Sequence, residues 1–513
     1  MHVNIATTAI VVSLVFQTLV VAQTLPDDLR ALMNEPRFKQ AHWGLLVVDQ
    51  ETKETLMEWN ADKLFVPAST TKLYSVACAM EELGADYRFI TRVYQAGRRD
   101  GDQLIGNLVL LASGDPSLGG RTTKEGLIAF TNNDHTYANG APETELTAPD
   151  PLAGIRDLAS QIAAKGIRRI RGDVWIDDRL FERAEGTGSG PSQLAPIMIN
   201  DNVIDISIEP TRTGEPCKLT IRPATKALVI ENSMRTVAAG ESLETWITPL
   251  GGGKVHVHGK MPEGHKPVVR IYEVPHAASF ARTLLIESLE EAGVAVDAAA
   301  VADHPAVSLP QGYDDLPVVG ELVSPPFSEF AKLTLKVSHN LHASTLPLLV
   351  ASKHGERTLR AGLRRQHDFL AKAGVDVDTI SFGGGAGGAR ADYVTPRATV
   401  QLLKYVTAQP YFQAYRSALP RLGVDGTLAK SLEPDSPARD RVFAKTGTLS
   451  WENVMNGGNL LTSKALAGYL ESSRGRKLLF AVFVNHVHLR GGLEARSIGK
   501  DLGKVAEIVH KSL

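Results

Sequence analysis

The chain has 513 residues, of which 43% are hydrophobic and 22% charged, as in soluble globular proteins. This length exceeds what one hydrophobic core usually supports, so we expect about two to four domains. The formal net charge of −2 excludes an electrostatic argument for binding nucleic acid or an anionic membrane surface. Only two cysteines occur, Cys78 and Cys217. They could pair, but a buried small residue and a loop thiol are the simpler interpretation.

The amino terminus has the composition of a secretory signal. No Asp, Glu, Lys or Arg precedes Asp27, and the apolar stretch 5–22 ends in the small-residue pattern VVA. We therefore predict a signal peptide over 1–22, cleaved after Ala22. The alternative is an uncleaved anchor, since eighteen helical residues would reach about 27 Å. Polar side chains within the stretch argue against stable spanning, so we expect export and at most peripheral membrane association.

A strand–turn–strand pattern is followed by a helix. The segments 42–50 and 55–60 are predicted strands, joined by the polar turn ETKE. Apolar residues then recur at helical spacing from Leu73 to Leu83, and Gly84 offers a stop. This places Ser69, in FVPASTTKLYS, at the first turn of a largely buried helix.

Further along the chain the pattern changes twice. From about 96 to 280, short β-rich segments alternate with turn residues, and 131–145 and 184–193 are predicted exposed loops. Helical patterns return at 279–294 and 327–353. The last third alternates helices with strands and closes with a helix from about 494. We interpret this as one α/β domain interrupted by a long, mainly β insertion.

Ser69 and Lys72 are candidates for nucleophile and base. Three positions apart on a helix, they share a face. A lysine takes a proton from a serine only if its pKa is lowered by burial or by a second cation, and the apolar helix offers burial. The alternative is that Ser69 caps the helix, although a capping box would have Glu or Gln at position 72. The pattern alone is weak, because SIGK at 497–500 also matches it.

Two later motifs carry polar residues where structure alone does not require them. SHN, at 338–340, separates two apolar helical runs, a costly position unless the residues line a cleft; the alternative is a satisfied helix junction. KTG, at 445–447, lies in the strand pattern RVFAKTGTLS. An edge strand there would admit a substrate backbone while Lys445 and Thr446 hold a carboxylate; the alternative is an exposed strand end.

The order S-x-x-K, S-x-N, K-T-G is a strong joint signal, and it favours Ser69 as a nucleophile. With it, the chain resembles the penicilloyl-serine transferases, most closely the low-molecular-mass class C penicillin-binding proteins, which are D-alanyl-D-alanine carboxypeptidase/endopeptidases. The 269 positions (338 − 69) between the first two motifs suit this family's large inserted domains, not a class A β-lactamase. Four stretches support the resemblance: GDPSL (114–118), GDVWIDDRLF (172–181), LAPIMINDNVIDISIEP (194–210) and GVDGTL (423–428).

The resemblance implies an α/β (α+β) fold of the β-lactamase/transpeptidase type. A central antiparallel sheet is flanked by helices and interrupted by a long, mainly β insertion. The expected domains are a discontinuous catalytic domain, 25–95 plus 280–513; an inserted domain II, 96–212 plus 262–279; and an inserted domain III, 213–261. The expected location is the periplasm.

The resemblance also implies the roles of the site residues. Ser69 would attack the carbonyl between two D-alanines, and Lys72 would take its proton. Ser338 and Lys445 would relay that proton to the leaving amine, and Asn340 would hold the acyl-side amide.

Strand residues would complete the site. Thr446 would bind the substrate carboxylate with Lys445, Gly447 and Thr448 would line the strand edge, and the N–H groups of Ser69 and Thr448 would form the oxyanion hole. Peptidoglycan stem peptides are the implied substrates and β-lactams the implied inhibitors. No metal or organic cofactor is expected.

Two departures concern substrate preference. GGGAGGAR (383–390) stands where the family has DGSGLSR, and His339 is the middle residue of SHN.

The glycines of 383–388 match a dinucleotide fingerprint, but no helix follows directly. The strand pairs His256/His258 and His486/His488 could seed a metal site, but no third ligand at suitable spacing is evident.

Two rival functions remain open from the sequence. One is a serine β-lactamase or esterase on the same scaffold. The other is a non-catalytic wall-binding or β-lactam-sensing protein. The sequence does not decide the stem-peptide preference, the balance of carboxypeptidase and endopeptidase activity, or the oligomeric state.

Overall fold

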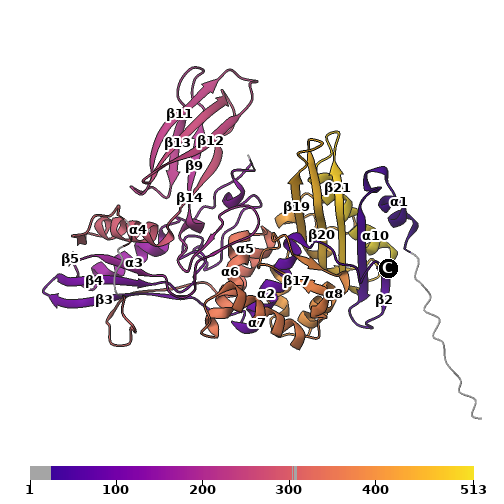
Figure 1. Ribbon diagram of the computed structural model, residues 1–513, viewed down its shortest axis with the longest axis horizontal. Coiled ribbons are helices and arrows are strands. Elements are labelled where there is room, and N and C mark those ends of the chain that lie inside the picture. The colour runs from indigo at the N-terminus through magenta and orange to yellow at the C-terminus, as the bar shows by residue number, and fades with distance from the viewer. Residues whose placement is uncertain (1–24, 142, 303, 305–308) are drawn as a thin grey trace, which may run out of the picture.

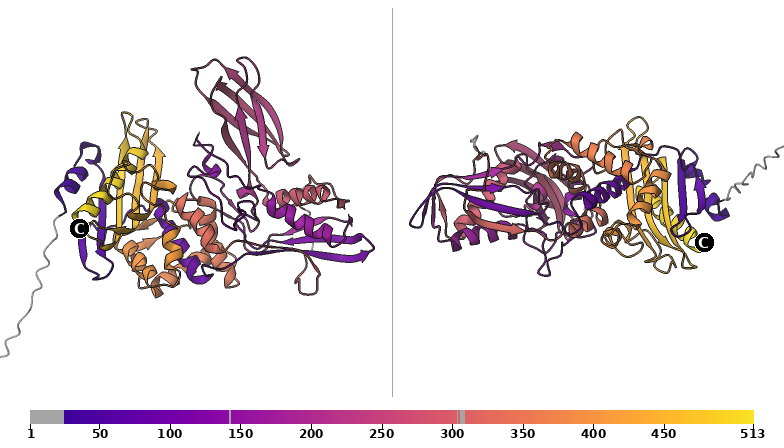
Figure 2. Two further views of the ribbon diagram at one scale, coloured as in Figure 1. Left: turned by 180° about the vertical axis from the view of Figure 1, so that it is seen from behind. Right: turned by 90° about the horizontal axis from the view of Figure 1, so that it is seen from below.

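The structure is a computed structural model that describes residues 25–141, 143–302, 304 and 309–513. The predicted signal peptide lies outside the described residues. Within those ranges, none of the helices has the length and apolar character needed to cross a membrane. Figures 1 and 2 show an elongated molecule, with a sheet near the two ends of the described chain and an insertion extending away from it.

Strands from both ends of the chain form one antiparallel sheet. Its order is β19-β20-β21-β1-β2, so the strand that carries KTG lies at an edge, as predicted. Strand β1 pairs along its whole length with β21, Leu45 lying opposite Val482. The bounds are β1 His42–Asp49, β2 Thr55–Trp59, β19 Val442–Glu452, β20 Asn459–Glu471 and β21 Lys477–Leu489.

Helices cover both faces of this sheet, which explains the nearly continuous apolar run of β1. Leu46 and Val48 face one core, and Leu45 and Val47 face the other, following the two-residue period of a strand. The second core is closed by α1 (Asp27–Met33) and α10 (Ala495–Ser512). The first is closed by α2 Thr71–Glu82, α5 Phe327–Lys336, α6 Asn340–Lys353, α7 Leu359–Lys372, α8 Pro396–Thr407 and α9 Phe412–Ser417. The predicted α+β fold, a sheet between helices, is confirmed.

The insertion has a hydrophobic core of its own. A sheet ordered β15-β5-β4-β3-β16, with β6 beside β4, packs against two helices. Its elements are β3 Ile90–Asp100, β4 Gln103–Leu111, α3 Ala153–Ala164, β5 Arg169–Arg171, β6 Val174–Asp177, α4 Ala277–Glu291, β15 Ala295–Val296 and β16 Val318–Val323. Because α4 packs on α3 and β16 pairs with β3, we propose that the insertion ends near residue 324, not near the 280 expected from the sequence.

Two small sheets extend the insertion and project from it in Figure 1. One is ordered β10-β9-β14 and the other β11-β13-β12. Their bounds are β9 Val203–Glu209, β10 Lys218–Arg222, β11 Val229–Val237, β12 Glu244–Gly251, β13 Lys254–Pro262 and β14 Val268–Glu273. Both cysteines are free and buried, Cys78 beside the five-stranded sheet and Cys217 in a loop of the insertion. The simpler interpretation, a buried small residue and a loop thiol, is therefore confirmed.

Short elements complete the chain. They are η1 Pro36–Phe38, η2 Ala68–Thr70, η3 His135–Tyr137, β7 Ala184–Glu185, β8 Gln193–Leu194, η4 Asn200–Asn202, η5 Val377–Thr379, β17 Ile380–Ser381, β18 Tyr393–Val394 and η6 Gly426–Leu428. Of these, η2 matters most for the site, because it precedes α2 directly and packs against β19.

Candidate active site

Ser69 lies in η2, immediately before α2, and is half-buried. The residue that caps α2 is Thr70, and no side chain makes a capping hydrogen bond there. The Ser69 hydroxyl instead lies at hydrogen-bond distance from Lys72 Nζ, 2.8 Å away. The alternative that Ser69 serves as a helix cap therefore does not fit the structure.

Lys72 is fully buried and its amine touches three oxygens. Nζ lies 2.8 Å from Ser69 Oγ, 2.7 Å from Asn340 Oδ1 and 2.8 Å from the Ala386 carbonyl. Burial, and then the charge of Lys445, hold the pKa of Lys72 well below its usual range. A neutral amine can donate to Asn340 and Ala386 and direct its lone pair at the Ser69 hydroxyl, which is the arrangement a base needs.

The SHN motif forms the turn between α5 and α6. Ser338 has a φ of +66°, in the left-handed region that non-glycine residues rarely adopt. Its carbonyl accepts a hydrogen bond from the Tyr137 hydroxyl. Asn340 begins α6, and its Nδ2 donates to the Ser189 carbonyl at 2.7 Å while its Oδ1 faces Lys72. The SHN turn therefore contacts Lys72 of the S-x-x-K motif and is more than a junction between two helices.

The KTG motif lies on β19 beside η2. Lys445 is buried, its Nζ donates to the Thr446 carbonyl at 2.9 Å, and burial together with the charge of Lys464 lowers its pKa to about 7. Thr446 donates to Thr427 Oγ1 at 2.7 Å, and Lys464 donates to Thr448 Oγ1 at 2.8 Å. Two amines and several hydroxyl groups therefore gather along β19 and the adjacent strand β20.

Gly447 allows this strand to approach the serine. A Cβ added at Gly447 would lie 2.6 Å from the Pro67 carbonyl and 3.3 Å from Ala68 Cβ. Any side chain would push β19 away from η2, so the motif requires glycine at this position.

The segment GGGAGGAR is packed against the same turn. At Gly387, where φ is +88°, an added Cβ would lie 1.9 Å from the Ala68 carbonyl. The Asp392 carboxylate anchors the segment by accepting from the N–H groups of Gly383, at 2.7 Å, and Ala389, at 2.8 Å. Gly387 thus allows close backbone approach to the serine turn, and Gly385 and Gly388 allow close approach to the Ala343 carbonyl and to Gly188. The segment links β17 to β18, which leads into α8 at Pro396, so the helix that a dinucleotide site needs directly after its glycines is absent here.

Several contact residues were not found from the sequence. Tyr137 lies in the segment 131–145 that was predicted to be an exposed loop, yet its neighbours Asp134 and His135 are buried, so that prediction was wrong there. No short sequence pattern indicated that the Ser189 carbonyl or the Lys464 amine would contact site residues. Asp392 follows the glycine segment directly and was the easiest of these to notice.

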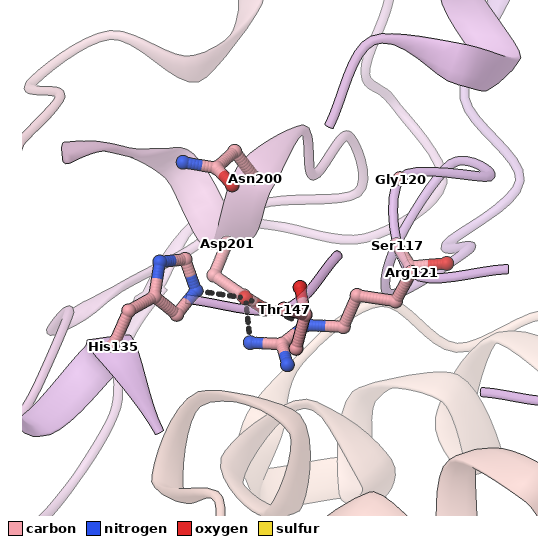
Figure 3. Close-up of a pocket in the computed structure, with 7 residues that line it drawn as sticks. All are labelled: Ser117, Gly120, Arg121, His135, Thr147, Asn200 and Asp201. Carbon is pink, nitrogen blue, oxygen red and sulfur yellow. Dashed lines mark hydrogen bonds and ion pairs between the residues drawn. The ribbon is translucent and has the colours of Figure 1, made fainter. Parts of the chain in front are cut away.

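Among the described residues, two groups could hold a metal: Asp201, His339 and His342, and Asp134, His135 and Asp201. Figure 3 shows Asp201 between His135 and Arg121 in a small cavity of the insertion. The Arg121 guanidinium lies 2.6 Å from Asp201, and neighbouring carboxylates raise the pKa of His135 to about 10 despite its burial, which favours the charged ring. Cations of the chain itself therefore already neutralise these carboxylates.

The histidine pairs considered from the sequence have other partners. His256 and His258 stack with ring centroids 4.6 Å apart on β13, and His258 lies 3.0 Å from Thr248 Oγ1. His486 contacts His42 edge to face at 5.6 Å. The expected absence of a metal stays a prediction.

Comparison with known proteins agrees with this site. The D-Ala-D-Ala carboxypeptidase 3 (S13) family model matches residues 25–506. A D-alanyl-D-alanine carboxypeptidase of an Actinomadura species is 28% identical over 488 residues, covering 90% of this chain and 81% of that protein. The D-alanyl-D-alanine carboxypeptidase DacB of Haemophilus influenzae is 22% identical over 471 residues, covering 88% and 87%.

Solved structures show the same fold. The crystal structure of penicillin binding protein 4 from Haemophilus influenzae has a TM-score of 0.71 at 20% identity, covering 94% of this chain and 100% of that one. The same protein in complex with a β-lactam has a TM-score of 0.68, also at 20% identity, covering 94% and 99%. The chain therefore belongs to the D-Ala-D-Ala carboxypeptidase 3 (S13) family and is a serine D,D-peptidase.

Proposed function

We propose that Ser69 is the nucleophile of this D,D-peptidase and that Lys72 is its base. The observation that carries the proposal is the 2.8 Å contact between Lys72 Nζ and Ser69 Oγ, made by an amine whose pKa is lowered by complete burial. Neutral Lys72 takes the hydroxyl proton as Ser69 Oγ attacks the carbonyl between the two terminal D-alanines. The N–H groups of Ser69 and Thr448 hold the resulting oxyanion.

The intermediate then breaks its C–N bond. The proton passes through Ser338 and Lys445 to the departing amine, and free D-alanine leaves an acyl group on Ser69. Water releases this acyl group. Penicillin acylates the same serine, but its leaving group stays attached and hydrolysis is slow.

Substrate binding is assigned to the strand edge and the SHN turn. Charged Lys445 and the Thr446 hydroxyl hold the terminal carboxylate, and the peptide lies along the free edge of β19 next to Gly447 and Thr448. Asn340 Nδ2, which here donates to the Ser189 carbonyl, would instead donate to the carbonyl oxygen of the acyl-side amide.

The finer activity follows from the same site. We propose that the enzyme removes the terminal D-alanine of stem peptides, opens D,D-crosslinks to some extent, and acts in the periplasm after export. The family match favours neither rival function, the β-lactamase or esterase nor the non-catalytic wall-binding or β-lactam-sensing protein.

Covalent labelling with a fluorescent penicillin tests the proposal. The wild-type chain should carry a label that persists for minutes, peptide mapping should place it on Ser69, and Ser69→Ala should carry none. Rapid loss of the label would favour a β-lactamase. A folded wild-type chain that takes no label would refute the nucleophile assignment.

A further inference from the structure

Six of the buried ionisable residues at and behind the SHN turn lie close to one another around Asp201. We call them the buried charge cluster: Arg121, Asp134, His135, Asp201, His339 and His342. None is more than 6% exposed. The first four belong to the insertion, and the two histidines belong to the α5–α6 turn and the first turn of α6. The cluster therefore joins the two bodies of the protein at the catalytic motif.

Asp201 is the centre of the cluster. Its Oδ2 lies 2.6 Å from Arg121 and 2.8 Å from His135, and its Oδ1 lies 2.7 Å from His342 Nε2. Arg121 also binds Asp134 at 2.8 Å. In a low-dielectric interior such charge-assisted bonds hold their partners in a narrow geometry.

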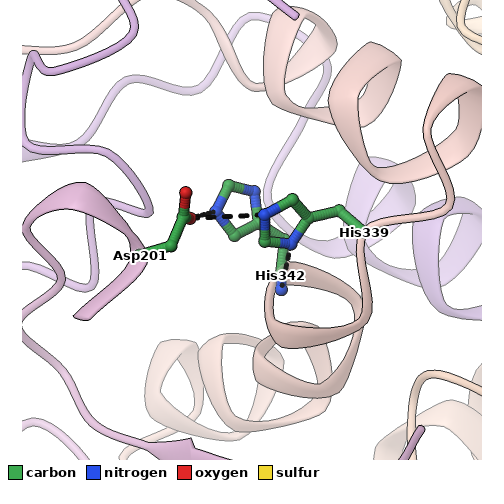
Figure 4. A group of neighbouring side chains, drawn as sticks. All are labelled: Asp201, His339 and His342. Atoms are coloured by element: carbon green, nitrogen blue, oxygen red, sulfur yellow. Dashed lines mark hydrogen bonds and ion pairs between the residues drawn. The ribbon is translucent and has the colours of Figure 1, made fainter. Parts of the chain in front are cut away.

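His339 connects this centre to the catalytic turn, because it stands between Ser338 and Asn340. Its Nδ1 accepts a hydrogen bond from the His342 N–H at 3.3 Å and so caps α6. Its Nε2 faces Asp201 Oδ1 at 3.4 Å, as Figure 4 shows, and makes no hydrogen bond within the described residues. Burial lowers the pKa of His339 to about 4, so the ring is neutral and Nε2 carries the hydrogen.

The insertion also holds the other side of Ser338. Tyr137 donates its hydroxyl to the Ser338 carbonyl, and Tyr137 belongs to η3, which Asp134 caps by accepting from the Thr136 N–H at 3.1 Å. Since Ser338 adopts a left-handed φ, its conformation needs support from its surroundings. The segment 134–137 of the insertion thus contacts Ser338 through Tyr137 and contributes Asp134 and His135 to the buried charge cluster.

We propose that the insertion positions Ser338 and Asn340 for acylation through the buried charge cluster, with Asp201 and His339 as positioning residues. The inference rests on the roles proposed above for Ser338 and Asn340. Neither positioning residue touches the substrate. A shift of about 1 Å in a reacting group can reduce a rate by about 100-fold, so a small displacement of the turn has a measurable effect.

The test compares two Asp→Asn variants of the full chain. Asp201→Asn removes the charge at the centre of the cluster. Asp173→Asn, the matched control, weakens the pair that Asp173 makes with buried Arg282 at 2.6 Å, next to β6 of the insertion. The rate of fluorescent penicillin labelling on Ser69 should fall at least about tenfold in Asp201→Asn and stay within about twofold in Asp173→Asn. Circular dichroism confirms that each variant is folded.

A second pair of variants covers the case in which Asp201→Asn does not fold. His339→Asn keeps a side-chain acceptor for the α6 cap, and His339→Ala removes it. The alanine variant should label about tenfold more slowly. The asparagine variant should label only about threefold more slowly, because it restores the cap of α6 but not the contact with Asp201. Rescue by asparagine distinguishes positioning from a general loss of stability.

Three outcomes would overturn the inference. The first is a folded Asp201→Asn chain that labels at the wild-type rate. The second is wild-type labelling in both His339 variants. The third is stoichiometric zinc in the purified protein that His342→Asn removes, because a metal would then hold the turn. A wild-type chain without label would refute the proposed function itself, so the two failures are distinguishable.

Discussion

The two buried groups of charges in this protein behave in opposite ways. In the catalytic body, the part of the chain outside the insertion, buried Lys72 feels the charge of buried Lys445, and Lys445 feels that of half-buried Lys464. Burial lowers the pKa of Lys464 to about 8. Burial and then the charge of Lys464 lower the pKa of Lys445 to about 7, and burial and then the charge of Lys445 hold that of Lys72 well below its usual range. Like charges in a dry site therefore favour the neutral form of an amine, which can accept a proton.

In the insertion, Arg121, Asp134, His135 and Asp201 are also buried, but their charges persist. Arg121 holds the pKa values of Asp134 and Asp201 well below their usual range, and neighbouring carboxylates raise that of His135 to about 10. The difference lies in pairing. A nearby opposite charge keeps a buried group ionised, whereas a nearby like charge favours its neutral form. One arrangement suits proton transfer and the other suits a rigid support.

The largest expected effect comes from removing the base. Lys72→Met should slow acylation of Ser69 by roughly 10²–10⁴-fold, the usual contribution of a general base. Stopped-flow labelling with a fluorescent penicillin measures this rate. The matched control is Lys500→Met, the lysine of the other S-x-x-K match, which is exposed and near Glu433. Acylation by folded Lys72→Met within tenfold of wild type would contradict the base assignment.

Removing the fixed cation should mainly change stability. Arg121→Met removes the guanidinium that pairs with both Asp134 and Asp201, and breaking such a buried pair costs about 3–5 kcal/mol of unfolding free energy. Arg92→Met, the control, breaks a pair with Glu321 in which both side chains are 41% exposed, and should cost about 0–1 kcal/mol. Urea unfolding followed by circular dichroism gives both values. Equal losses in the two variants would show that the cluster is not held by its charges.

Much of the catalytic body was predictable from the sequence because its signals are local. Ser69 and Lys72 are one helical turn apart, and the strand at 42–50 and the edge position of β19 follow from short patterns. The structure brings Lys72 into direct contact with Ser69 and Asn340. It places Lys445 on β19, which packs against the turn that carries Ser69. The order of the three motifs in the sequence, S-x-x-K, S-x-N and K-T-G, indicated that these residues belong to one site.

The buried charge cluster was not predictable in the same way. Asp201 and His342 are 141 positions apart, and the polar segment around Asp134 has the composition of an exposed loop. Only the folded chain brings the opposite charges together and removes them from water. The same limit applies to α4: its apolar face predicts burial but does not say which of two cores it joins.

A smaller effect is expected at the glycine segment. Asp392→Asn replaces a carboxylate that accepts from two backbone N–H groups with an amide that can accept only through its oxygen. The loss should be about 1–3 kcal/mol of unfolding free energy. Exposed Asp435→Asn is the control and should change little. If Asp392→Asn unfolds at the same urea concentration as wild type, the carboxylate does not hold the segment as the hydrogen bonds indicate.

The smallest effect is a shift along the pH axis. A lysine is charged below its pKa, so Lys445 binds the substrate carboxylate below about pH 7 and loses this ability as the pH rises further. The KM for a peptide ending in D-Ala-D-Ala should therefore increase above about pH 7. Burial and then the charge of Lys464 lower the pKa of Lys445, so in Lys464→Met the increase should begin at a higher pH. Lys477→Met, on the surface of the same sheet, should leave it unchanged. An identical profile in all three proteins would mean that Lys464 does not tune Lys445, and that burial alone makes this lysine titrate near neutrality.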